Sequence, residues 1–191
     1  MKFYLDITLL PDEETDLGFL WQKVYQQVHL SLVENKQSDN SSLVAISFPQ
    51  YGETNFPLGD KLRLLAGNAE LLERLDLARW LTRLVDYCHT TSIKPVPTNV
   101  KYVQFRRNQF NSNVHRLARR RAKRKGETVE ESLNYFASFK DEQTRLPYIN
   151  MQSLSKDKKF KLFIKKESAE QEQSGEFNCF GLSKTATTPW F

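Results

Sequence analysis

Hydrophobic and polar residues alternate through "KFYLDITLL" at residues 2–10, which predicts a β-strand because successive strand side chains point to opposite faces. Residues 17–34 instead repeat their hydrophobic positions about every 3.6 residues, and this period predicts an amphipathic helix. The apolar faces are formed by Phe3, Leu5, Ile7 and Leu9 in the strand, and by Leu17, Leu20, Trp21, Val24, Val28 and Leu32 in the helix.

Three more strands are predicted in the first half of the chain. "LVAISF" at 43–48 is apolar and ends at Pro49, and "KLRLLAG" at 61–67 follows after a polar stretch. "TSIKPVPT" at 91–98 predicts a weaker strand, because its prolines cannot donate hydrogen bonds to a neighbouring strand.

A helical segment separates the last two of these strands. Asn68 can cap it, and it extends to about Tyr87 with a break near Asp76. The order β-α-β-β-α-β predicts an antiparallel sheet with helices on one face. The fold class is therefore α+β, with a ferredoxin-like (RRM-like) domain at 1–98 and a smaller α+β domain at 99–191.

The second region is predicted to contain four strands. They are "VKYVQF" at 100–105, "PYINMQSLS" at 147–155, "KFKLFIKKE" at 159–167 and "EFNCFGLS" at 176–183, with 167–175 as a hairpin loop. A helix over 113–125 begins at Asn113, its N-cap, and ends at Gly126. Thr128 and Glu131 form a capping box that opens another helix.

Charge is segregated along the chain. The net charge is +5, yet residues 87–126 hold 11 of the 28 Lys and Arg and none of the 23 Asp and Glu. The rest of the chain has 17 basic and 23 acidic residues, a net of −6. A basic segment in an otherwise acidic protein indicates a surface for a phosphate backbone.

The helix at 113–125 has two opposite faces. Val114, Leu117, Ala118 and Ala122 form its apolar stripe. The other face carries Arg116, Arg119, Arg120, Lys123 and Arg124. Like charges four residues apart repel by a few tenths of a kcal/mol, so this face is unfavourable without an anionic partner. Nucleic acid is the expected partner, and RNA and DNA both remain open at this point.

Composition excludes several classes of protein. Cys88 and Cys179 are too few for a disulfide framework or a zinc site, which favours a cytoplasmic location. Asp6 interrupts the apolar N-terminus, so we expect no signal peptide, and no apolar run is long enough for a membrane span. Metal-binding carboxylate clusters, phosphate-binding loops and nucleophile motifs do not occur, so neither a metal nor a cofactor is expected.

The histidines offer one route to catalysis. The chain has only His29, His89 and His115, and His29 lies at the edge of the apolar stripe of the first helix. Such a histidine is more often structural than catalytic. In RNA, however, the 2′-hydroxyl beside the scissile phosphate is an internal nucleophile, and a neutral imidazole is suited to removing its proton.

Several segments, in order, resemble a known family. They are "FYLDITLLPD", "VHLSLV", "AISFPQY", "LGDKLRLLA", "RNQFNSNVHRLARRR", "LPYINMQSLS", "KFKLFI" and "CFGLSKTATTPWF". Together they resemble the type I-F CRISPR-associated endoribonuclease that processes the precursor of CRISPR RNA. The resemblance implies that the basic helix lies in the major groove of the CRISPR repeat hairpin.

The resemblance also implies a reaction and partners. The family cuts the repeat RNA at the 3′ base of its hairpin by attack of the 2′-hydroxyl, without metal. The products are a 5′-hydroxyl and a 2′,3′-cyclic phosphate. The enzyme is a monomer when free. It stays on the mature CRISPR RNA as a subunit of the type I-F surveillance complex.

Four catalytic positions carry over from the family. His29 is the general base, Ser153 holds the ribose that carries the nucleophile, and Ser155 supports it. Phe180 stands where the family commonly has a Tyr whose hydroxyl orients the histidine. Loss of that hydrogen bond predicts a less firmly held His29 and a slower cut. Without the resemblance, both serines would be ordinary strand-edge residues.

The RNA-binding positions carry over as well. They are Arg107, Gln109, Arg116, Arg119, Arg120, Lys123, Arg124 and Phe160. Arg107 and Gln109 suit bidentate contacts with a guanine and an adenine. Phe160 stacks on the base pair beside the cut, although a core phenylalanine is almost as good an interpretation. Lys123, where Arg is common, keeps the charge and loses the planar fork.

Two other functions stay open. The first is a catalytically weak or inactive RNA hairpin-binding subunit, which the replacement of Tyr by Phe180 suggests. The second is a DNA-binding protein that places its basic helix in a B-form groove.

Overall fold

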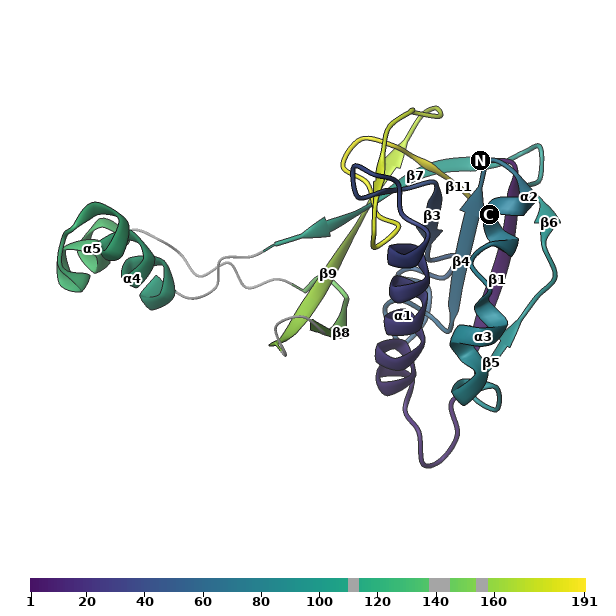
Figure 1. Ribbon diagram of the computed structural model, residues 1–191, viewed down its shortest axis with the longest axis horizontal. Helices are drawn as coiled ribbons and strands as arrows, with labels where there is room; N and C mark the ends of the chain where they lie inside the picture. The colour runs from purple at the N-terminus through teal and green to yellow at the C-terminus, as the bar shows by residue number, and fades with distance from the viewer. Residues whose placement is uncertain (110–113, 138–144, 154–157) are drawn as a thin grey trace. The chain divides into compact units, whose positions relative to one another are not determined.

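A computed structural model describes residues 1–109, 114–137, 145–153 and 158–191 (Figure 1). The chain divides into two compact units. One consists of Met1–Asn108 and Pro147–Phe191, and the other of Gln109–Leu146. These units differ from the two domains predicted from the sequence, 1–98 and 99–191. The predicted domains were divided by function, and that division stays a prediction.

The first unit contains an antiparallel sheet with the strand order β3-β4-β1-β5. Its strands are β1 (Phe3–Leu9), β3 (Val44–Ser47), β4 (Lys61–Ala66) and β5 (Cys88–Thr90), with β6 (Lys94–Pro95) also paired to β1. The predicted strands at 2–10, 43–48 and 61–67 are confirmed.

The predicted strand at 91–98 is largely wrong. The edge beside β1 is occupied mainly by β5, and only Lys94 and Pro95 of the predicted segment pair with β1. The reason is that Pro95 and Pro97 have no backbone N–H, which interrupts the series of hydrogen bonds to β1, whereas every residue of Cys88–Thr90 has one.

The helices of this unit are α1 (Leu17–Glu34), α2 (Ala69–Glu73) and α3 (Leu77–Leu81), and the 3-10 turn η1 (Thr82–Leu84) follows. The Asp16 carboxylate accepts from the backbone N–H of Phe19 and caps α1. The predicted break near Asp76 is confirmed, since Asp76 adopts a left-handed conformation with φ 46° between α2 and α3. Helices α1 and α3 contact each other and lie on the same face of the sheet (Figure 1).

A second sheet in the same unit has the order β11-β7-β9-β8. Its strands are β7 (Lys101–Asn108), β8 (Tyr148–Ser153), β9 (Lys158–Ala169) and β11 (Thr188–Trp190). The predicted strands at 100–105, 147–155 and 159–167 correspond to β7, β8 and β9. Strand β11 was not predicted, because Pro189 breaks the sequence signal of a strand.

The predicted strand at 176–183 is mostly wrong. Only β10 (Phe177–Asn178) is a strand, and it pairs with β2 (Ser41–Ser42). The chain then turns, with a hydrogen bond from the Gly181 N–H to the Asn178 carbonyl. Gly181 has φ 68°, and a Cβ there would lie 2.6 Å from Ile46, so a side chain would not fit. This turn carries Cys179 and Phe180.

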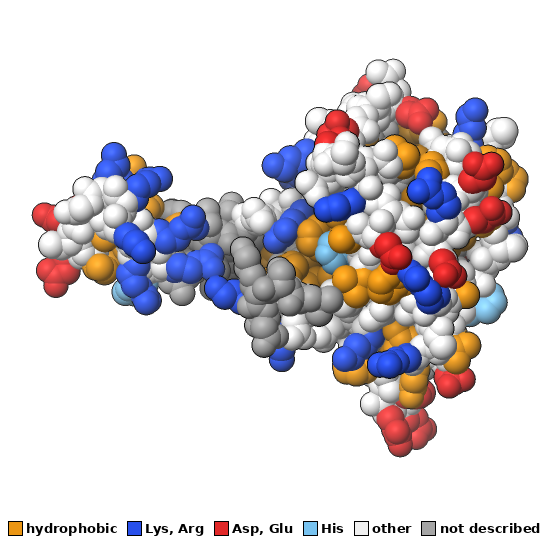
Figure 2. Space-filling model, in the orientation of Figure 1, with side chains coloured by type: hydrophobic (Ala, Val, Ile, Leu, Met, Phe, Trp, Pro, Cys, Tyr) orange, Lys and Arg blue, Asp and Glu red, His pale blue; other side chains and the backbone are white. Residues whose placement is uncertain are grey.

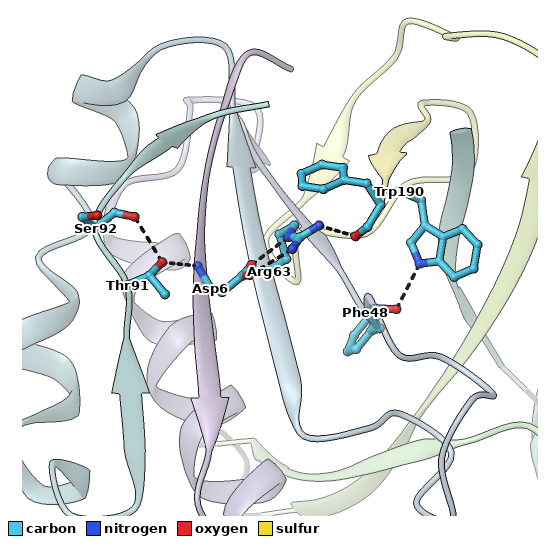
Figure 3. A network of polar contacts seen from close by, with 7 residues as sticks. Asp6, Phe48, Arg63, Thr91, Ser92 and Trp190 are labelled. Carbon is cyan, nitrogen blue, oxygen red and sulfur yellow. Dashed lines mark hydrogen bonds and ion pairs between the residues drawn. The ribbon is translucent and has the colours of Figure 1, made fainter. Parts of the chain in front are cut away.

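A buried ion pair fastens the C-terminal residues to the first sheet (Figure 3). Arg63 on β4 donates to both carboxylate oxygens of Asp6 on β1, at 2.7 and 2.9 Å. Arg63 also donates to the Phe191 carbonyl at 2.6 Å, and its guanidinium lies 3.9 Å from the centre of the Phe191 ring. The two sheets of this unit share one hydrophobic core, which positions β7, β9 and the 178–182 turn relative to α1.

The second unit contains α4 (Val114–Lys125) and α5 (Val129–Tyr135), which pack on each other. Gly126 follows α4 with φ 71° and ends it as predicted, and the predicted capping box of Thr128 and Glu131 is present. The predicted cap Asn113 lies outside the described residues. Within the described ranges, no helix is long and apolar enough to cross a membrane.

Candidate active site and basic helix

His29 lies on α1 with a defined tautomer. Its Nδ1 is 2.8 Å from the Cys179 carbonyl oxygen. A carbonyl can only accept a hydrogen bond, so the proton of the neutral imidazole is on Nδ1. The lone pair is therefore on Nε2, which is the atom able to take a proton from a substrate.

The environment of His29 keeps the imidazole neutral. Burial is the largest cause and lowers the pKa of His29, and the positive charge of Arg107 lowers it further. The hydrogen bond to Cys179 acts in the opposite direction. The net effect is a pKa below the ordinary value, so the imidazole is mainly in its basic form at neutral pH.

Phe180 stacks on His29. The two ring centres are 4.1 Å apart, and the planes are parallel at 0°. The sequence predicted that Phe180, lacking a hydroxyl, would leave His29 less firmly held. In the structure the imidazole has two other constraints, the stack with Phe180 and the hydrogen bond to the Cys179 carbonyl.

Tyr25 joins this cluster although sequence reasoning missed it. Its hydroxyl donates to the Phe180 carbonyl at 2.8 Å, and the residue is completely buried. Tyr25 precedes His29 by one helical turn on α1. The spacing of four residues between Tyr25 and His29 could have predicted that both face the same cluster, because residues i and i+4 lie on the same side of a helix.

Arg107 reaches the cluster from β7. It continues the inward-facing series of Val103 and Phe105, since alternate residues of a strand share a face. Its guanidinium carbon lies 5.3 Å from the centre of the Phe160 ring and 5.4 Å from that of Phe180. Its Nε is buried and makes no hydrogen bond to any described residue.

The structure thus brings together four predicted site residues that are distant in sequence: His29, Arg107, Phe160 and Phe180. Phe160 lies on β9, edge-on to Phe180 with ring centres 6.4 Å apart. It is partly buried against the core, and its ring also contacts the cluster. Its predicted stacking on a base pair stays a prediction.

The structure also describes the positions of Ser153 and Gln109. Ser153 is half-buried at the end of β8, which is held beside α1 by a 3.2 Å hydrogen bond from the Gln152 backbone N–H to the Gln26 side chain. Gln109 is exposed just after β7. Ser155 lies outside the described residues.

Helix α4 presents one cationic face. Arg116, Arg119, Arg120, Lys123 and Arg124 are all exposed, whereas Ala118 and Ala122 are buried. Figure 2 shows Lys and Arg side chains gathered on the unit that carries α4. Arg121 differs from these five cations, because it pairs with Glu127 at 2.6 Å and stacks at 3.7 Å on Tyr135. Arg121 therefore joins α4 to α5.

The described residues contain no group of three or more His, Cys, Asp or Glu side chains that could hold a metal ion.

Comparison with known proteins identifies the family to which this chain is similar. Residues 4–191 match the family described as CRISPR-associated protein (Cas_Csy4). The chain is 37% identical over 192 residues to the CRISPR-associated endonuclease Cas6/Csy4 of Escherichia coli (strain UTI89 / UPEC). It is 33% identical over 193 residues to the CRISPR-associated endonuclease Cas6/Csy4 of Pseudomonas aeruginosa (strain UCBPP-PA14). Each comparison covers the whole of both chains.

Proposed function

The chain belongs to the Cas_Csy4 family of CRISPR-associated proteins, and on this premise we propose that it is a metal-independent endoribonuclease specific for CRISPR repeat RNA. It cuts at the 3′ base of the repeat hairpin. It then stays on the mature CRISPR RNA as a subunit of the type I-F surveillance complex. The free protein is a cytoplasmic monomer. The observation that carries this proposal is the neutral His29 with its Nε2 lone pair available.

The reaction uses the RNA's own nucleophile. The Nε2 of His29 takes the proton of the 2′-hydroxyl, and the 2′-oxygen attacks the adjacent phosphorus. The bond from phosphorus to the 5′-oxygen breaks, and that oxygen takes up a proton. The products are a 2′,3′-cyclic phosphate and a 5′-hydroxyl. Ser153, with Ser155 in support, holds the ribose in line for the attack.

RNA recognition is divided between bases and phosphates. Arg107 and Gln109 contact bases near the bottom of the stem, and Phe160 stacks on the base pair beside the cut. The cationic face of α4 holds phosphates and supplies affinity for any RNA stem. An open-ended hairpin admits the whole helix to its major groove, which a long A-form duplex would not.

We also propose two domains by role. Residues 1–98 form a ferredoxin-like domain that supplies His29, and 99–191 form the hairpin-binding domain. Two observations support the first assignment. The strands of the sheet are antiparallel in the spatial order β3-β4-β1-β5, and along the chain α1 and the α2–α3 segment lie between strands in the order β-α-β-β-α-β.

Three functions are separated by one experiment. The protein is incubated in EDTA with labelled repeat RNA and, separately, with duplex DNA of the same sequence. Cleavage of the RNA supports the endoribonuclease. A mobility shift without cleavage would instead indicate the weak or inactive hairpin-binding subunit, and a preference for duplex DNA would indicate a DNA-binding protein.

Arg107→Ala is expected to weaken binding of the cognate hairpin by about 1–3 kcal/mol and to relax preference at one base pair. Binding is measured with the cognate stem and with a set of single base-pair variants. The matched control is Arg106→Ala, because Arg106 points to the opposite face of β7 and pairs with Glu167 at 2.9 Å. Equal losses for cognate and scrambled stems would rule out base recognition by Arg107.

Phe180→Tyr is expected to keep RNA affinity and to leave the cleavage rate unchanged or raise it. The tyrosine ring keeps the aromatic face that stacks on His29, and its hydroxyl adds a polar group near the imidazole. Single-turnover cleavage and the thermal unfolding midpoint are measured together. A large fall in rate with unchanged unfolding would show that the ring edge has no room for a hydroxyl.

A further inference from the structure

Two residues of α1 hold two consecutive carbonyl groups of the 178–182 turn. Tyr25 donates from its hydroxyl to the Phe180 carbonyl, and His29 donates from Nδ1 to the Cys179 carbonyl, each at 2.8 Å. Because peptide groups are planar, the φ and ψ angles of Phe180 alone set the angle between these two carbonyls. Fixing both carbonyls therefore fixes the backbone of Phe180, and with it the direction of the Cα–Cβ bond from which the ring projects.

The orientation of Phe180 matters because its ring lies parallel to His29. The same turn thus constrains the imidazole twice, through the Cys179 carbonyl and through the Phe180 ring. From the other side, the turn is held by the Phe180 N–H, which donates to the Asn178 side chain at 2.8 Å, and by the Ile46 N–H, which donates to the Gly181 carbonyl. The Tyr25 contact, by contrast, comes from the same helix that carries His29.

We propose that Tyr25 is a positioning residue for RNA cleavage: its hydroxyl sets the 178–182 turn so that the Cys179 carbonyl and the Phe180 ring hold His29 with the Nε2 lone pair facing substrate. The proposal rests on the proposed function of His29 as general base. Tyr25 acts through the turn and touches neither RNA nor the reacting atoms.

The hydroxyl is a constant donor. Burial raises the pKa of Tyr25 well above its ordinary value, and the nearby charge of Arg107 only partly offsets this. The phenol is therefore protonated at neutral pH. A donor that stays protonated suits a fixed structural contact and does not suit a proton-transfer role.

The test compares two tyrosines that make the same kind of bond. Tyr25→Phe removes the hydroxyl that binds the Phe180 carbonyl and keeps the buried ring. Tyr51→Phe removes a hydroxyl that binds the Ile164 carbonyl at 2.9 Å on β9, and so serves as the matched control. Each variant loses one hydrogen bond from a tyrosine to a backbone carbonyl, although Tyr25 is completely buried and Tyr51 is half-buried.

The first readout is the tautomer of His29 in the protein without RNA, measured from the ¹⁵N chemical shifts of the two ring nitrogens. In the unsubstituted protein and in Tyr51→Phe, Nδ1 is expected to carry the proton. In Tyr25→Phe, the population protonated at Nε2 is expected to increase, because the carbonyl that selects Nδ1–H is no longer held in place.

The second readout is single-turnover cleavage of repeat RNA. Tyr25→Phe is expected to slow the chemical step by about three- to tenfold, the size of one hydrogen bond's contribution, with an unchanged dissociation constant. Tyr51→Phe is expected to cleave at the normal rate. The combination of a slower step and unchanged binding separates positioning of the base from loss of the RNA site.

The two readouts distinguish failure of this inference from failure of the proposed function. An unchanged His29 tautomer in Tyr25→Phe would overturn the role of Tyr25, whatever the cleavage rates. A shifted tautomer with an unchanged cleavage rate would mean that His29 is not the general base. Equal slowing in both tyrosine variants would show a general effect of stability, and would also overturn the positioning role.

Discussion

His29→Ala is expected to abolish detectable cleavage of repeat RNA while leaving its binding almost unchanged. General base catalysis contributes about 10²–10⁴-fold to a rate, and the alanine side chain has no group to replace the imidazole. Affinity should persist because the cationic face of α4 is untouched. Single-turnover cleavage and a mobility-shift titration on the same RNA provide the two measurements. His89→Ala, an exposed change on β5, is the matched control and should cleave normally.

A change in the RNA substrate tests the same mechanism independently of any change in the protein. One 2′-deoxy substitution just upstream of the scissile phosphate should also prevent cleavage without preventing binding, since it removes the nucleophile. EDTA should have no effect on normal RNA. Ser153→Ala should slow the reaction less than His29→Ala does, because it disturbs only the position of the ribose. Cleavage of the deoxy substrate, or inhibition by EDTA, would require water or a metal-bound hydroxide as the nucleophile.

The double variant Arg119→Ala, Arg120→Ala is expected to weaken binding of every RNA stem, cognate or scrambled, by a similar factor. Both side chains are exposed on α4, so neither substitution creates a cavity. Each phosphate contact contributes a slope of about 0.9 to the dependence of log affinity on log salt concentration, so two lost contacts should lower the slope by about two. Titrations at several salt concentrations measure both quantities.

Arg121→Ala is the matched control on the same helix. Arg121 pairs with Glu127 and stacks on Tyr135, so its loss should destabilise the packing of α4 on α5 and leave the salt slope nearly unchanged. Unfolding monitored by circular dichroism separates this effect from RNA binding. If Arg121→Ala lowered the slope as much as the double variant, the assignment of the phosphate-binding face would be wrong.

The sequence by itself determined the elements whose residues repeat with a clear period. Strand β1, helix α1 and the two faces of α4 follow from local spacing. The spacing of apolar residues within each element shows which of its sides is buried. The segregation of charge was equally visible, and it indicated a polyanionic partner without any knowledge of the fold. The roles of individual site residues came from the resemblance to a family, and not from these patterns.

Only the tertiary structure decided how the candidate site is assembled. His29 and Cys179 are 150 residues apart, and no local pattern shows that a carbonyl of one turn selects the tautomer of a histidine on a distant helix. The same holds for the stack of Phe180 on His29 and for the Tyr25 hydroxyl on the Phe180 carbonyl. Short strands such as β2, β5 and β11 were missed for a related reason, since two or three residues carry too little periodicity and are defined by their pairing partners. Periodicity reports which residues are buried, whereas contacts between distant segments depend on how the buried faces meet.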